Sequence, residues 1–150
     1  AGMLGSEWFV THPTVPIDSV VAQLNADMIG RNAPDSLMLV GPRAAPNGQS
    51  RVLGALVDSV NTALARPFTI NREWDSPDHP EQIYLRSDHY SYAKRGIPIV
   101  FYTTGLHEDY HKVTDEVSKI DFDKLSRVSE LIMRSALAVA NRAERPRPGR

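Results

Sequence analysis

This chain of 150 residues contains no cysteine. A disulfide framework and a thiolate metal site are therefore excluded, and any bound metal would be held by His, Asp and Glu side chains. No apolar run approaches the roughly 18 residues that a membrane-spanning helix needs. The net charge of -1 provides no electrostatic basis for binding nucleic acid. We therefore expect neither a membrane span nor a nucleic-acid partner.

Several common functional signatures are also missing. The sequence contains neither the phosphate loop G-x-x-x-x-G-K-[ST], nor the dinucleotide fingerprint G-x-G-x-x-G, nor the nucleophile elbow G-x-S-x-G. Nucleotide-binding and serine-hydrolase functions thus have no specific support, and metal chemistry remains. The chain also lacks an initiator Met, a charged leader and a cleavage site, so we expect its N-terminus to be a cut.

The hydrophobic fraction of 41% is sufficient for one core in a single domain. Strands are predicted in four apolar runs, 20–29, 37–41, 68–70 and 97–102. Helices are predicted over 5–10, 52–64, 90–93 and 121–139. The first strand is expected to be interior and buried on both faces. Ser6 is expected to cap the first helix, and Ser87 or Asp88 the third.

Alternation of strands with helices predicts a three-layer α/β domain over residues 1–142. Proline-containing loops are expected at 75–80, and a further loop at 107–115 follows the last strand. Residues 143–150, rich in Pro and Arg, are expected to form a disordered tail.

Residues 107–111 read His-Glu-Asp-Tyr-His and match the motif H-E-x-x-H, in which two His one helical turn apart hold zinc. A zincin-type site would use His107 and His111 as ligands and Glu108 as general base, with Glu130 available as a third ligand. The motif requires a helix, whereas this stretch follows a predicted strand and continues into β-branched residues. The zincin remains an alternative.

Two other short runs place metal-ligand residue types at the ends of predicted strands. Residues 25–31 read Asn-Ala-Asp-Met-Ile-Gly-Arg, and residues 109–111 read Asp-Tyr-His. A carboxylate and an imidazole delivered from two strand ends are typical material for a zinc site in an α/β protein. Two ligands do not complete such a site.

Five segments occur in a characteristic order: 2–6 (Gly-Met-Leu-Gly-Ser), 24–30 (Leu-Asn-Ala-Asp-Met-Ile-Gly), 87–90 (Ser-Asp-His-Tyr), 95–101 (Arg-Gly-Ile-Pro-Ile-Val-Phe) and 110–115 (Tyr-His-Lys-Val-Thr-Asp). Together they resemble the C-terminal half of the co-catalytic two-zinc metallopeptidases, family twenty-eight, which includes bacterial aminopeptidases, glutamate carboxypeptidases and glutaminyl cyclases. The resemblance implies a phosphorylase/peptidase-like α/β/α sandwich with a mixed, mostly parallel central sheet, of which this chain is the C-terminal portion.

The resemblance also implies roles for individual residues. Asp27 corresponds to a ligand of one zinc ion, and His111 to a ligand of the other. Tyr110 corresponds to the tyrosine whose hydroxyl stabilises the oxyanion as metal-activated water attacks the peptide carbonyl. Residues 87–88 resemble a supporting motif near the pocket. Asp115 is expected to accept the second ring N–H of His111, because metal-bound His usually donates it to an acceptor.

The expected function is therefore that of a zinc-dependent exopeptidase, an aminopeptidase that acts on peptides with two zinc ions. In the family, a Glu-Glu pair precedes the segment matched here by residues 2–6, and a His and a bridging Asp lie still earlier. None of these is present, so we expect the isolated chain to be inactive and to need the N-terminal half of the same domain. A secreted or periplasmic location is in keeping with the resemblance. A non-catalytic binding module of the same fold is the other alternative, against which retention of Asp27, Tyr110 and His111 argues.

The remaining His and Trp residues have simpler interpretations. His12 and His79 each adjoin a proline and are expected to be solvated. His89 is expected to be a hydrogen-bonded residue at a helix start and not a ligand. Trp8, Phe9 and Trp74 are expected to be packing residues or pocket wall, with a border on a substrate side-chain site as the alternative for Trp74.

Overall fold

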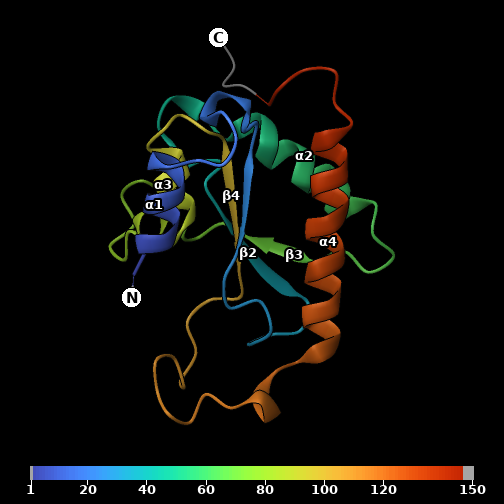
Figure 1. Cartoon of the computed structure of the whole chain (residues 1–150). Helices are drawn as coiled ribbons and strands as arrows, with labels where there is room; N and C mark the ends of the chain where they lie inside the picture. The colour runs from blue at the N-terminus through green and yellow to red at the C-terminus, as the bar shows by residue number, and fades with distance from the viewer. Residues whose placement is uncertain (1, 147–150) are drawn as a thin grey trace.

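The computed structural model describes residues 2–146, within which a four-stranded sheet has helices on both faces (Figure 1). The strands are β1 (Gln23–Ala26), β2 (Ser36–Val40), β3 (Thr69–Asn71) and β4 (Ile99–Thr103). The helices are α1 (Leu4–Thr11), α2 (Arg51–Thr62), α3 (His89–Ala93) and α4 (Phe122–Ala140). Short 3-10 turns are η1 (Ile17–Ser19), η2 (Pro46–Gly48), η3 (Ile83–Leu85) and η4 (Val117–Lys119).

The strand order is β1-β4-β2-β3. β1 runs parallel to β4 and β2 runs parallel to β3, whereas β2 and β4 are antiparallel. The mixed, mostly parallel sheet expected from the resemblance is therefore confirmed. In the register of β1 and β4, Ala26 lies opposite Tyr102. Because the two strands are parallel, the chain leaves both of them at the same end of the sheet.

Two hydrophobic clusters lie on opposite faces of the sheet. Along β4, Val100 and Tyr102 face the cluster formed with α2 and α4, while Ile99 and Phe101 face the cluster formed with α3. This alternation follows from the two-residue period of a strand. All five residues of β4 are buried, so β4 is covered on both faces.

The expectation of an interior strand over 20–29, buried on both faces, is wrong in extent and in burial. β1 contains only four residues and pairs with β4 alone, at the edge of the described sheet. Ala22, Leu24 and Ile29 pack partly buried against the α2 and α4 cluster. The run is apolar because one side of it packs against the core, and that does not require pairing along both edges.

The predicted helix caps at Ser6 and at residues 87–88 are also wrong. Ser6 lies inside α1, where its hydroxyl donates to the carboxylate of Asp88 at 2.6 Å and ties α1 to α3. Asp88 occupies the N-cap position of α3 without making a side-chain cap. Asp121 does cap its helix, since its carboxylate accepts the backbone N–H of Lys124 at 2.9 Å.

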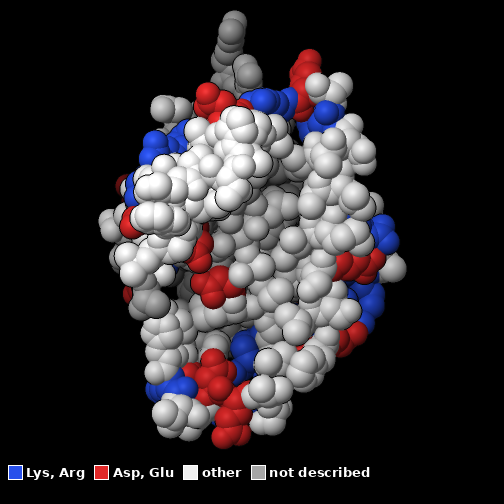
Figure 2. Space-filling model, viewed as in Figure 1, with Lys and Arg blue, Asp and Glu red and all other residues white. Residues whose placement is uncertain are grey.

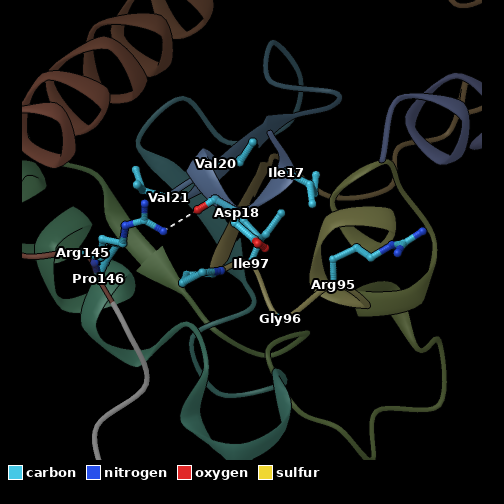
Figure 3. A pocket seen from close by; sticks show the side chains of 10 residues that line it. Ile17, Asp18, Val20, Val21, Arg95, Gly96, Ile97, Arg145 and Pro146 are labelled. Carbon is cyan, nitrogen blue, oxygen red and sulfur yellow. Dashed lines mark hydrogen bonds between the residues drawn. The ribbon is translucent and has the colours of Figure 1, made fainter. Parts of the chain in front are cut away.

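The C-terminal segment returns to the chain before β1. The Arg145 guanidinium donates to the carbonyl oxygen of Asp18, and both residues line a cavity of about 340 Å³ together with Ile97 (Figure 3). Of the expected disordered tail, residues 143–146 contain no helix or strand, and residues 147–150 lie outside the described residues. None of the helices in residues 2–146 combines the length and the apolar composition that a bilayer crossing requires.

Candidate metal centre

The parallel pairing of β1 and β4 brings the two candidate ligand segments together. Asp27 follows β1 directly, and its backbone N–H donates to the Tyr102 carbonyl at 3.2 Å. The loop that follows β4 returns to the same end of the sheet. A cavity of about 390 Å³ there is lined by all of the site residues that the resemblance indicated: Asp27, Ser87, Asp88, Tyr110, His111 and Asp115.

A directional chain of hydrogen bonds orients the Asp27 carboxylate. The Ser87 hydroxyl donates to Oδ2 of Asp27 at 2.9 Å. The same hydroxyl oxygen accepts the side-chain amide of Asn25 at 3.0 Å. Asn25 and Ser87 are buried, whereas Asp27 is exposed to the cavity. Asp27 is therefore held from its buried side, with its other carboxylate oxygen directed away from this support.

His89 continues this chain into the core, as a fully buried residue at the start of α3. Its Nε2 lies 2.8 Å from the Tyr84 carbonyl, which can only accept, so the proton belongs on Nε2. Nδ1 then accepts from the Asn25 amide at 3.4 Å. Burial lowers the pKa of His89 to about 4. The expectation that His89 is hydrogen-bonded is confirmed.

Both candidate ligand segments contain a residue with left-handed backbone geometry. Met28, next to Asp27, and His111 each have φ of 58°. Such a conformation is uncommon for residues other than Gly and costs free energy that the surrounding contacts must offset. At Met28 the compensation is visible, because its carbonyl accepts the Thr104 backbone N–H at 2.9 Å and the Thr104 hydroxyl at 2.6 Å.

The zincin alternative is contradicted by the backbone. Residues 108–111 form turns, closed by a 3.0 Å hydrogen bond from the Tyr110 N–H to the His107 carbonyl. The left-handed φ of His111 excludes it from an α-helix, so the two His are not presented on one helical face. Glu130 lies on α4 and pairs with Arg134 at 2.8 Å. Residues 107–111 therefore match H-E-x-x-H in sequence but do not form the helix that the motif requires.

The loop also corrects the expected role of Asp115. Its carboxylate accepts from Arg31 and lies 3.9 Å from Nε2 of His107, and the described residues show no bond from it to His111. The His111 ring instead stacks on Tyr110 with centroids 3.9 Å apart. Nearby, the Lys119 ammonium, with Thr114 and Arg31, holds the pKa of Asp109 well below its usual range.

Comparisons with known proteins decide the family. The model of peptidase family M28 matches residues 1–136. This chain belongs to peptidase family M28. A search of curated protein sequences gives no match.

Solved structures of similar fold are aminopeptidases by name. An aminopeptidase from Aneurinibacillus sp. strain AM-1 aligns at 22% identity and TM-score 0.66, covering 99% of this chain and 31% of that one. Legionella pneumophila LapA aminopeptidase aligns at 20% identity and TM-score 0.66, covering 95% and 37%. BSAP, a zinc aminopeptidase from Bacillus subtilis, aligns at 15% identity and TM-score 0.66, covering 98% and 35%. The M28 chain thus has their fold and spans about a third of their length.

The donor set of this M28 chain fits part of a zinc site. The Asp27 carboxylate and the His111 imidazole are ligand types that zinc accepts, and both line one cavity. Within residues 2–146, however, no group of three or more His, Asp or Glu side chains is arranged to hold a metal ion. A zinc site normally has four ligands, so further ligands are needed to complete one.

Sequence reasoning missed two residues at this candidate site. Arg86 lines the same cavity, and Asn25 supports Asp27 through Ser87. Asn25 was within reach of sequence reasoning, because residues 25 and 27 face the same side of a strand. Trp74 lines a smaller cavity of about 30 Å³ that shares Asp27 and Tyr110 with the larger one. Its expected place beside the pocket is in keeping with this position.

Proposed function

We propose that this chain is part of the catalytic domain of a zinc-dependent aminopeptidase. The observation that carries the proposal is the convergence of Asp27, Tyr110 and His111 on one cavity at the ends of two parallel strands. In this proposal Asp27 binds one zinc ion and His111 binds a second. Bound zinc supplies a Lewis acid that polarises the peptide carbonyl and lowers the pKa of water.

The chain's own residues orient the reacting groups. Ser87 engages Oδ2 of Asp27, which leaves the other carboxylate oxygen for the metal. The Tyr110 hydroxyl donates a hydrogen bond to the oxygen of the peptide carbonyl as negative charge develops on it. The stacked Tyr110 and His111 rings keep this hydroxyl and the imidazole in a fixed relation.

The described site is incomplete, and we propose that its remaining groups lie in sequence beyond this chain. The chain spans 31% to 37% of two of the solved relatives. The missing groups would include the general base, the bridging carboxylate and the other zinc ligands. Residues 1–142 would then be the C-terminal part of one catalytic domain, and the isolated chain would not hydrolyse peptides. The edge strand β1 is the natural place for the rest of the sheet to pair.

A non-catalytic module of the same fold is the competing function. It would have no need for a strained backbone at His111 or for a buried Asn25–Ser87 support behind an exposed carboxylate. These features cost stability and are expected where a side chain must be held for chemistry. They favour the enzyme.

Zinc titration of the 150-residue chain by calorimetry tests the proposal. We expect binding on the order of micromolar or weaker, as suits an incomplete site. Asp27→Ala and His111→Ala should each weaken it at least about tenfold, since even loss of a supporting partner costs that much. His79→Ala, which changes a histidine outside the cavity, is the matched control and should leave binding unchanged. Binding that survives both ligand changes and is lost with His107→Ala would refute the proposed ligands.

A further inference from the structure

Arg31 belongs to the same run of sequence as Asp27, and its backbone is anchored to α4. The preceding Gly30 carbonyl accepts the Asp121 N–H at 2.9 Å. The carbonyl of Arg31 itself accepts the ammonium of Lys124, a fully buried residue, at 2.7 Å. The segment after Asp27 therefore has a rigid attachment to the body of the domain.

The side chain of Arg31 reaches from this anchored segment into the loop that carries His111. One guanidinium nitrogen donates to Asp109 at 2.5 Å, and the other donates to Asp115. These two carboxylates lie on either side of the Tyr110–His111 pair in the sequence. The Arg31 side chain is only 12% exposed, so both contacts are partly shielded from water and retain more of their strength than surface ion pairs.

Asn32 donates to the carbonyls of Thr104 and Leu106 at 2.8 and 3.0 Å where the segment after β4 begins, and beyond that point the loop has few other ties. Its backbone hydrogen bonds are local turns, such as the 2.8 Å bond from the Lys112 N–H to the Asp109 carbonyl. Residues 111–119 are all exposed, and Val113 is 99% exposed, so apolar packing contributes almost nothing there. Figure 2 shows acidic and basic side chains gathered at the lower end of the molecule, where Figure 1 places the loop between β4 and α4. Lys119 adds one further tie, to Asp109 at 2.6 Å.

We propose that Arg31 is a positioning residue that sets the placement of the His111 loop relative to Asp27. The planar guanidinium suits this task because its fork reaches two separate carboxylates at once, which a lysine ammonium does less well. The structural half of the inference stands on the contacts alone. Its consequence for metal binding rests on the proposed zinc function.

Hydrogen exchange followed by mass spectrometry tests the structural half on the full 150-residue chain without metal. Arg31→Ala should speed exchange of amides 107–116 about tenfold or more, because two charge-assisted contacts to the loop are lost, while β4 and α4 keep their protection. Arg31→Lys should give an intermediate rate. Arg66→Ala is the matched control: Arg66 is 60% exposed and pairs with Asp123 on the surface, so its loss should leave the loop unchanged.

Asp115→Asn provides a second variant that keeps the Arg31–Asp109–Lys119 contacts and so protects the fold. It should loosen the loop less than Arg31→Ala does. The inference is overturned by unchanged loop exchange in Arg31→Ala, and equally by faster exchange spread over β4 and α4, which would mean a general stabilising role.

Zinc affinity of the same variants separates this inference from the proposed function. If both are right, Arg31→Ala weakens zinc binding about tenfold, Arg31→Lys restores part of it, and Arg66→Ala has no effect. If Arg31→Ala loosens the loop but Asp27→Ala leaves zinc affinity unchanged, the proposed zinc site is refuted and the Arg31 inference stands. An unchanged loop with zinc binding sensitive to Asp27→Ala would refute the Arg31 inference alone.

Discussion

His89 should make the folded chain sensitive to mild acid. Its ring is fully buried, donates from Nε2 to the Tyr84 carbonyl and stacks on Phe101 with centroids 4.7 Å apart. Burial lowers its pKa from 6.5 to about 4. Between these two values the unfolded chain binds a proton that the folded chain does not. The free energy of unfolding therefore falls as pH decreases from 6.5, and this contribution is fully lost below pH 4.

The size of the effect follows from the shift. At about 1.36 kcal/mol per pKa unit, this histidine should remove roughly 2 kcal/mol of stability between about pH 7.5 and 5, and roughly 3 kcal/mol by pH 4. That is a substantial fraction of the 5 to 15 kcal/mol typical of a small domain. Protonation also removes the acceptor at Nδ1, so the Asn25 amide loses this partner.

Urea unfolding followed by tryptophan fluorescence measures this stability, with Trp8 and Trp74 as the probes. Measurements from about pH 7.5 to 5 stay above the range in which most carboxylates titrate. His89→Gln keeps an amide that can donate to the Tyr84 carbonyl but removes the titrating ring. The variant should be less stable at neutral pH and should lose most of the pH slope. A slope equal to that of the unchanged chain would refute the assignment to His89.

Two further predictions concern stability alone and can be measured by the same assay. Asp75→Ala should cost about 3 kcal/mol, because its fully buried carboxylate accepts three backbone N–H groups of residues 41–44, which would be left without their partner; a loss below about 1 kcal/mol would contradict this. Gly54→Ala should destabilise α2 by about 1 to 3 kcal/mol despite the better helix propensity, since a Cβ there would lie 2.4 Å from the Pro42 ring. Gly5→Ala in α1 is the matched control, with no atom within 4 Å of the added Cβ, and should be neutral or slightly stabilising.

Periodicity predicted the helices and the interior strands well because their side chains follow the burial pattern closely. In β2 the buried residues are Leu37, Leu39 and Val40, and in α2 the Val and Leu positions are buried or half-buried. The same reasoning failed over residues 20–29, where apolar side chains pack against α4 but the backbone before Gln23 does not pair in the sheet. An apolar run reports burial of side chains and not which backbone edges are paired.

The same limit of local reasoning applies to the residues of the candidate site. Ser87 and Asp88 were assigned to helix capping because serine and aspartate favour that position locally. In the folded chain their side chains instead contact Asp27 and Ser6, which are distant in sequence. Local propensity cannot anticipate such contacts, since they exist only once β1 and α1 have packed beside α3. The resemblance to a known family indicated residues 87–88 as a supporting motif near the pocket, without indicating which atoms they contact.

The topology explains why one sheet end carries the candidate site. Had β1 and β4 been antiparallel, Asp27 would leave the sheet at the end opposite to the loop that carries His111, about the length of a four-residue strand away. Parallel pairing brings together the two points at which the chain leaves β1 and β4. The segment that follows β4, however, is a long exposed loop that pairs with no strand of the described sheet. The Arg31 contacts compensate for this looseness, because they join the loop to the segment that already fixes Asp27. A substitution at Arg31 should therefore disturb the relation between the two ligands while each ligand keeps its own local support.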